Sequence, residues 1–202
     1  YVLYVFMLTF TAALFETAGR YGAAKLMGGS LTYEKGVAAG LGHGGIESMV
    51  IVGMAYVNNL ILVILINTGG FDVLAGSDGE SLELAKAFLT SSKVSSFYLA
   101  GYERILTMVF HLALSLLMCC CVMRKKDFMG IGLCLVFHWG VDFTVPMLGR
   151  LASVSSISSE MTQVLAYVFL TAVSAVSAVG IRHLRKLWRR EAGGARCAAG
   201  DV

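Results

Sequence analysis

Five apolar runs separated by short polar segments dominate the pattern of this chain. An α-helix rises about 1.5 Å per residue, so about 20 apolar residues cross the hydrocarbon core of a membrane. The runs predict spanning helices at residues 1–15, 37–66, 98–123, 128–148 and 161–181. The second run is long enough to be tilted, or broken near Asn58 and Asn59. We therefore predict an all-α fold: a polytopic transmembrane helix bundle in one domain, residues 1–202.

Composition supports this prediction. Of 202 residues, 57% are hydrophobic and only 14% are charged, far from the balance of a soluble domain. The net charge of +3 is too small to indicate nucleic-acid binding. The first run begins without an initiator Met or a charged leader, so we expect the natural protein to continue upstream.

The five cysteines form neither a disulfide framework nor paired zinc motifs. Cys119, Cys120 and Cys121 lie together near the end of an apolar run. We interpret them as small packing residues, with palmitoylation at a helix end as the alternative.

The positions of Lys and Arg predict an orientation. Basic residues gather in segments 20–35, 124–126 and 182–190, which fall on one side of a five-span path. The positive-inside rule makes that side cytoplasmic. The opposite side receives the loop at residues 69–97 and a Ser-rich connection at 153–159. The basic tail, residues 182–202, is then a cytoplasmic anchor on anionic lipid or, alternatively, a partner-binding helix.

Three polar pairs interrupt the apolar runs at a spacing of four residues. They are Glu16 with Arg20, His43 with Glu47, and His138 with Asp142. Residues four apart share one face of a helix. An ionisable group deep in a membrane costs roughly 3 kcal/mol, so each pair is a functional hypothesis. The predicted topology places the last two pairs at overlapping depths, with His111 midway along the third span, so we expect one buried chamber.

Small residues accompany the second pair. Gly36, Gly40 and Gly44 form a GxxxGxxxG ridge, which lets a second helix approach closely. His43 and Glu47 flank this ridge. We expect a neighbouring helix to pack against it and to exclude lipid from the polar pair.

Four segments carry a resemblance to a known family. They are FETAGR at residues 15–20, GHGGIE at 42–47, ERILTMVFH at 103–111 and HWGVDF at 138–143. Together they resemble the motifs of the YhfC family of intramembrane metalloproteases, which is similar to the type II CAAX prenyl endopeptidases and the PrsW proteases. The resemblance extends over nearly the whole chain.

The resemblance implies peptide-bond hydrolysis inside the membrane, by one of two routes. In the first, Glu16 or Glu47 is the general base, and His43 or His138 binds the oxyanion. In the second, a metal ion such as zinc acidifies a water and polarises the carbonyl. Its candidate ligands are His43, Glu47, His111 and His138.

Four further residues receive supporting roles. Asp142 orients His138 across one helical turn. Arg20 holds Glu16 ionised, binds a substrate carboxylate, or merely anchors a helix end. Glu103 and Arg104 form a structural ion pair, with an influence on His111 as the alternative.

The leading prediction is an intramembrane endopeptidase in a bacterial plasma membrane, whose partners are lipid and a membrane-associated peptide or protein substrate. That substrate would enter laterally or from the cytoplasmic side. Two other classes remain open. Buried His, Glu and Asp groups also build transporters and ion carriers, and a related fold can serve as a non-catalytic membrane scaffold.

Overall fold

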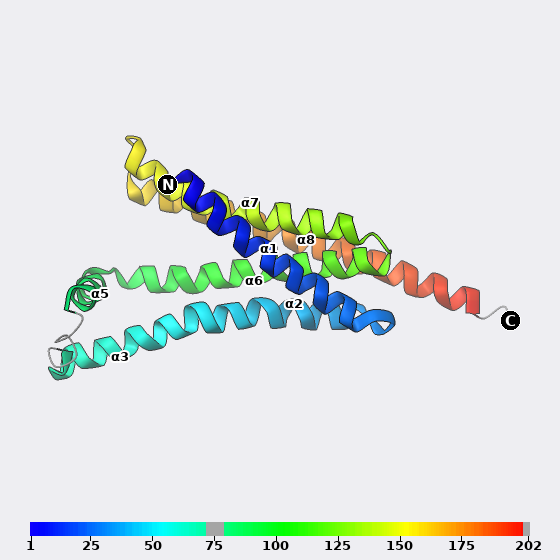
Figure 1. Cartoon of the computed structure of the whole chain (residues 1–202), viewed down its shortest axis with the longest axis horizontal. Coiled ribbons are helices and arrows are strands. Elements are labelled where there is room, and N and C mark those ends of the chain that lie inside the picture. Colours follow the sequence, from blue (N-terminus) through cyan, green and yellow to red (C-terminus); the bar gives the residue numbers. More distant parts are fainter. Residues whose placement is uncertain (72–78, 200–202) are drawn as a thin grey trace. The chain divides into compact units, whose positions relative to one another are not determined.

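The computed structural model describes residues 1–71 and 79–199, with side chains described as far as residue 190. Every regular element in these residues is helical, which confirms the all-α prediction (Figure 1). Five helical segments are long and apolar enough to span a membrane: Val2–Ser30, Tyr33–Thr68, Val94–Met123, Asp127–Val154 and Ser159–Arg190. The predicted polytopic membrane bundle with five spans is therefore confirmed. Asp72 and Asp78 of the predicted outer loop lie outside the described residues.

The structure contains the following helical elements, given in chain order. They are α1 (Val2–Met27), η1 (Gly28–Ser30), α2 (Tyr33–Glu47), η2 (Ser48–Gly53), α3 (Met54–Thr68), α5 (Gly79–Ser91), α6 (Val94–Met123), α7 (Asp127–Val154) and α8 (Ser159–Ala199). Contacts divide the chain into two compact units, Tyr1–Gly44 with Ile105–Val202 and Gly45–Arg104. The prediction of a single domain stays a prediction.

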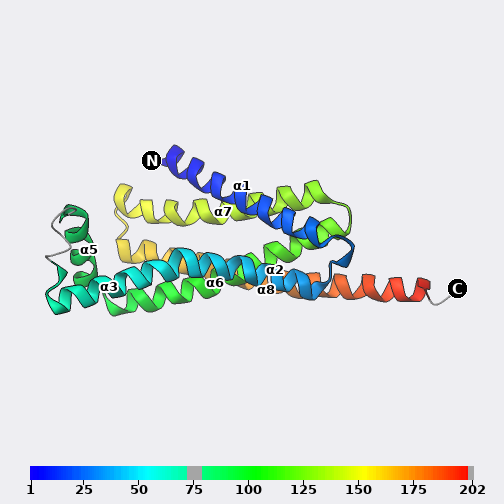
Figure 2. The same cartoon turned by 60° about the horizontal axis from the view of Figure 1, so that its bottom comes forward.

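Helix α6 is the centre of the first unit. α1 runs along α7, and α7 turns back along α8 (Figures 1 and 2). The core gathers side chains of α1, α6, α7 and α8: Ala24, Phe110, Leu114, Leu116, Met118, Cys119, Cys120, Cys134, Leu184 and Trp188. Cys119, Cys120 and Cys121 are buried free thiols, so the predicted packing role is confirmed. The apolar side chains that face outward suit a lipid environment rather than water.

The glycine ridge of α2 packs against α6. A Cβ atom at Gly40 would lie 2.8 Å from Leu112 Cδ1 and 3.0 Å from Leu112 Cα. At Gly44 it would lie 3.2 Å from His111 Cβ. Only glycine leaves room for so close an approach of two helices. The predicted ridge is confirmed, and its partner is the helix that carries His111.

The basic segments of the first unit meet at one end. Lys25 Nζ pairs with Asp127 Oδ2 at 2.5 Å, and Tyr21 donates a hydrogen bond to the same oxygen. Arg185 of α8 lies over the ring of Tyr33 at 5.8 Å. The end of α1, the starts of α2 and α7 and the part of α8 at Arg185 thus share one level, as the predicted topology requires. We call this the basic end.

Two boundaries differ from the prediction. The first helix does not end near residue 15 but continues to Met27, because the charges of Glu16 and Arg20 find protein partners instead of leaving the membrane. The break predicted near Asn58 and Asn59 is wrong in position. It is the π-helical segment η2, Ser48–Gly53, whereas both asparagines lie inside regular α3.

The second unit contains a helix that the sequence did not predict. Helix α5, Gly79–Ser91, lies within the stretch expected to be a loop and packs against α3. Tyr56 of α3 donates a hydrogen bond to the carbonyl of Phe97 at 3.2 Å.

The basic tail in the first unit is also helical: it continues α8 as far as Ala199.

Substitution of the central ridge glycine tests the packing of α2 on α6. Gly40→Ala should destabilise the protein by about 1–3 kcal/mol, because the new methyl meets the backbone of Leu112. Gly42→Ala is the matched control, since nothing lies within 4 Å of its new Cβ and alanine favours helix by about 1 kcal/mol. Thermal unfolding in detergent measures both variants. Equal melting temperatures would contradict the packing.

Candidate active site

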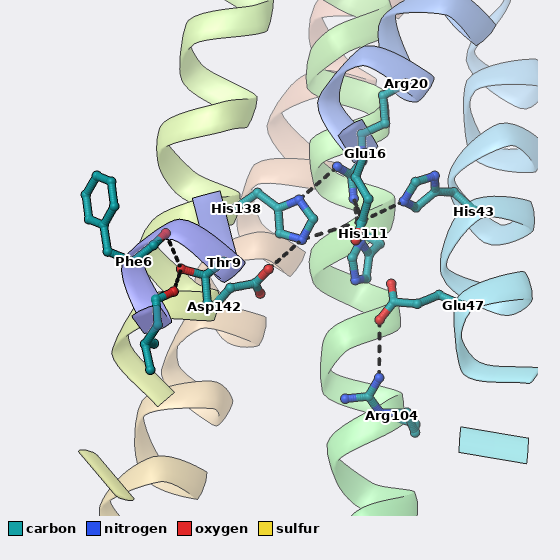
Figure 3. Close-up of polar contacts among 11 residues, drawn as sticks. Phe6, Thr9, Glu16, Arg20, His43, Glu47, Arg104, His111, His138 and Asp142 are labelled. Carbon is teal, nitrogen blue, oxygen red and sulfur yellow. Dashed lines mark hydrogen bonds and ion pairs between the residues drawn. The ribbon is translucent and has the colours of Figure 1, made fainter. Parts of the chain in front are cut away.

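Glu16 of α1 is the point on which the polar side chains converge. Its Oε2 atom lies 2.9 Å from His43 Nε2 of α2 and 3.2 Å from Arg20 Nη2 of its own helix. The same oxygen lies 3.5 Å from His138 Nε2 of α7 and 3.8 Å from His111 Nδ1 of α6 (Figure 3). Four helices of the first unit therefore supply nitrogen groups to one carboxylate.

The three histidines form a continuous row. The ring centroids of His43 and His111 are 5.4 Å apart, and those of His111 and His138 are 5.2 Å apart. Gly44 makes the first contact possible, because α6 approaches α2 at the position of His111. The predicted overlap in depth of these residues is confirmed within the first unit.

Arg20 lies behind the histidines and links two of them. Its side chain is only 1% exposed, whereas a cation that anchors a helix end among lipid headgroups would be exposed. Nη2 lies 2.5 Å from His111 Nδ1, and Nη1 lies 3.1 Å from His138 Nδ1. A guanidinium can only donate, so both Nδ1 atoms accept. Each neutral ring therefore carries its proton on Nε2.

This proton arrangement gives His138 a defined direction. Its Nε2–H points toward Asp142 Oδ2 at 3.3 Å and Glu16 Oε2 at 3.5 Å. Phe110 packs edge-on against the ring, with centroids 6.1 Å apart. The predicted pairing of Asp142 with His138 is present across one turn of α7. Because both ring nitrogens have partners, the imidazole is held in one orientation.

An aromatic cluster positions α1 beside α7. Phe6 packs edge-on against Trp139 at 5.2 Å, and Phe10 contacts the same ring at 6.3 Å. Phe143 packs against Trp139 at 5.6 Å. Since Trp139 directly follows His138, this cluster sets the register that brings Glu16 of α1 to His138.

Glu47 has charged partners in the second unit. Its Oε1 atom lies 3.3 Å from Arg104 Nη1 (Figure 3). Arg104 Nη2 in turn lies 2.6 Å from Glu103 Oε1. The predicted ion pair between Glu103 and Arg104 is therefore present. Glu47 ends α2 one turn beyond His43, and the π-helical segment η2 follows it directly. Such widened turns are frequent at functional sites.

The residues of the first unit fit a divalent metal in type and spacing. Ligand atoms of Glu16, His43 and His111 lie within 4.8 Å of one another. Tetrahedral zinc with bonds of about 2.0–2.2 Å holds its ligands about 3.3–3.5 Å apart, so small side-chain movements suffice. Glu16 is therefore a candidate metal ligand in addition to the predicted ones. His138, which was predicted as a ligand, instead contacts Arg20 and Asp142. Arg20 opposes a cation here, because its guanidinium occupies Nδ1 of His111.

One side of the cluster is accessible and the other is closed. The side chains of Glu16, His43 and Asp142 are 28%, 24% and 33% exposed, whereas those of Arg20 and His138 are 1% and 2% exposed. The Glu16 carboxylate is therefore accessible from outside the protein, while Arg20 and His138 behind it are shielded. The sequence reasoning missed Phe110, although its place next to His111 in ERILTMVFH gave a signal.

Comparison with known proteins supports a family relationship. The sequence profile of the family described as YhfC intramembrane metalloprotease matches residues 1–176. The "Uncharacterized membrane protein YhfC" of Bacillus subtilis (strain 168) is 30% identical over 118 residues, 57% of this chain. That match covers 46% of the length of the relative, so the chain corresponds to about half of it. No solved structure gives a significant match.

Removal of Arg20 tests the competition between guanidinium and metal. Arg20→Gln should bind zinc at least about tenfold more tightly, a difference of about 1.4 kcal/mol, because it frees His111 and removes a nearby positive charge. Isothermal titration of the purified chain in detergent measures the affinity. Arg150→Gln, which loses an exposed arginine next to Tyr1, is the control and should not differ from the original chain. Weaker zinc binding by Arg20→Gln would contradict the competition.

Proposed function

Because the chain belongs to the YhfC intramembrane metalloprotease family, we propose that it is an intramembrane endopeptidase that cleaves a membrane-associated peptide or protein. The observation that carries this proposal is the convergence of Arg20 and three histidines on Glu16 within membrane-spanning helices. Ionisable groups at that depth are costly, so a cluster of them needs a chemical reason. Peptide hydrolysis supplies one, since it requires a base, a proton donor and a water.

Glu16 acts as the general base. Arg20 and the imidazole N–H groups favour its ionised form, and its accessible side faces the substrate. The carboxylate takes a proton from a water while the water oxygen bonds to the scissile carbonyl carbon. A positioned base of this kind contributes about 10²–10⁴-fold to a rate.

His138 stabilises the charge that develops on the carbonyl oxygen. Because Arg20 occupies Nδ1, the Nε2–H of His138 is a fixed donor on the side of Glu16. Donors already in place in a water-poor site stabilise an oxyanion more than water does. When the C–N bond breaks, Glu16 returns its proton to the leaving nitrogen. The products are a carboxylic acid and an amine, which exchange a proton to become a carboxylate and an ammonium group.

A metal ion would add to this machinery. Glu16, His43 and His111 are the residues of the first unit that would hold it. When bound, zinc would acidify a water and polarise the scissile carbonyl. Glu47 remains a predicted base or ligand, since it follows His43 by one turn of α2.

The proposal extends to location. The Lys and Arg residues gathered at the basic end favour a cytoplasmic position for that end and for the tail. The family relationship favours a bacterial plasma membrane. A substrate then enters from the lipid phase or from the basic end, on the accessible side of Glu16.

Substitution of the base tests the proposal. Glu16→Gln keeps the shape of the side chain but cannot accept the proton of water, so kcat should fall at least about 100-fold. The probe is a quenched fluorescent peptide with one Leu/Ala transmembrane segment, reconstituted with the chain in liposomes. Mass spectrometry of the products identifies the cleaved bond.

The matched control is Glu34→Gln, the same change at an exposed glutamate in the first turn of α2. It should cleave at the rate of the original chain. Equal activity in Glu16→Gln, or no cleavage by any of the three proteins with and without added zinc, would count against the proposal.

A second substitution tests the orientation of His138. Asp142→Asn keeps the size of the side chain but removes the charge that supports the imidazole, so kcat should fall about 10–100-fold with KM little changed. Asp127→Asn, which weakens the ion pair with Lys25 at the first residue of the same helix, is the control for a purely structural effect. A rise in KM alone would instead place Asp142 in substrate binding.

A further inference from the structure

A second feature of the first unit lies on the far side of Phe110 from the carboxylate cluster. It is an apolar cavity of about 550 Å³ between α6, α7 and α8. Phe110 and Leu114 line it from α6, Val141 from α7, and Val176 and Gly180 from α8. Among its lining residues only Ser177 and His183 are polar. The chemistry described above does not use this cavity.

The dimensions of the cavity restrict its occupant. Its α8 lining extends from Phe169 to Leu184, about 22 Å at 1.5 Å per residue. The empty volume of the groove, its open side included, is about 1160 Å³, so its mean cross-section is at most about 53 Å². A helix about 10 Å across needs roughly 80 Å². Carbon atoms in contact lie about 3.5–4.0 Å apart, so an extended hydrocarbon chain fits where a helix does not.

One end of the groove is basic. His183 lines it, and Lys186 and Arg190 follow at three and seven residues, on the same face of α8. All three side chains are exposed. They lie at the basic end of the unit, where the predicted fifth span ends. A negatively charged group at this end would lie beside these basic side chains and next to the apolar groove.

We propose that this groove binds one anionic glycerophospholipid of the surrounding leaflet. One acyl chain lies along α8 between Phe110 and Val176, and the phosphate lies against His183, Lys186 and Arg190. Charge complementarity selects the headgroup, and the narrow cross-section excludes a helix in favour of an extended acyl chain. A phospholipid of the surrounding leaflet already has its headgroup at the level of the basic end and its acyl chains at the level of the groove.

The site is coupled to the carboxylate cluster through one side chain. Phe110 lines the groove and also lies 6.0 Å from the ring of His111 and 6.1 Å from that of His138. An acyl chain in the groove packs against the outer face of Phe110. The lipid thereby supports the packing of the two histidines.

Native mass spectrometry tests the proposal. The full chain, purified in detergent, is titrated with phosphatidylglycerol or with phosphatidylcholine of the same acyl chains. One phosphatidylglycerol should remain bound, at least about tenfold more tightly than phosphatidylcholine. Gly180→Leu should abolish this adduct, because a side chain at Gly180 meets open space and fills the groove. Gly132→Leu, also in open space but on the exposed side of α7, is its control and should retain the lipid.

A double variant tests the headgroup. Lys186→Gln with Arg190→Gln should remove the preference for phosphatidylglycerol. Arg182→Gln with Arg189→Gln removes equal charge one residue before His183 and Arg190, about 100° round the helix from each, and should keep it. Equal lipid retention by Gly180→Leu and Gly132→Leu would overturn the proposal. Oleate bound as tightly as phosphatidylglycerol, or a dimer of the chain in place of the lipid adduct, would also overturn it.

Discussion

The burial of the Arg20 guanidinium beside Glu16 is the constraint on which the rest of the first unit depends. A cation removed from water inside a membrane span must be surrounded by acceptors. Here the acceptors are the Glu16 carboxylate and the Nδ1 atoms of His111 and His138. This requirement draws α6 and α7 toward α1. It also orders the imidazole protons, so that one charged group determines the direction in which each of the two rings donates.

The packing of the helices allows Arg20, Glu16 and the histidines to come into contact. The glycines of α2 let its backbone lie on α6 near His111, which brings His43 within 2.9 Å of Glu16. On the opposite side, the aromatic residues around Trp139 hold α1 against α7. Small residues at one interface and large rings at the other thus place three helices around the carboxylate. These packing contacts take no part in the proposed reaction, but the positions of the residues around Glu16 depend on both interfaces.

Helices α6 and α7 each present two different faces. His111 and His138 face the carboxylate cluster, while the residues that directly precede them, Phe110 and Phe137, face the apolar groove along α8. Adjacent positions on a helix point about 100° apart, so one pair of helices can line a polar site and a lipid groove together. Phe110 separates the two environments. The membrane is the solvent of this protein and, if the groove binds lipid as proposed, it is also a packing partner of the site.

The apolar runs and the polar pairs at spacing four were sufficient to predict the five spans, the convergence of the histidines and the pairing of His138 with Asp142, because these features follow from helix periodicity. The glycine ridge likewise predicted a close partner for α2. Tertiary structure alone decided that Arg20 is buried, that Glu16 is the centre, and that the irregular turn falls at Ser48–Gly53 instead of at the asparagines. From sequence alone, a charged residue in an apolar helix indicates the end of a membrane span. Whether that charge is instead buried depends on partners from other helices, and those contacts are decided by how helices distant in sequence pack together.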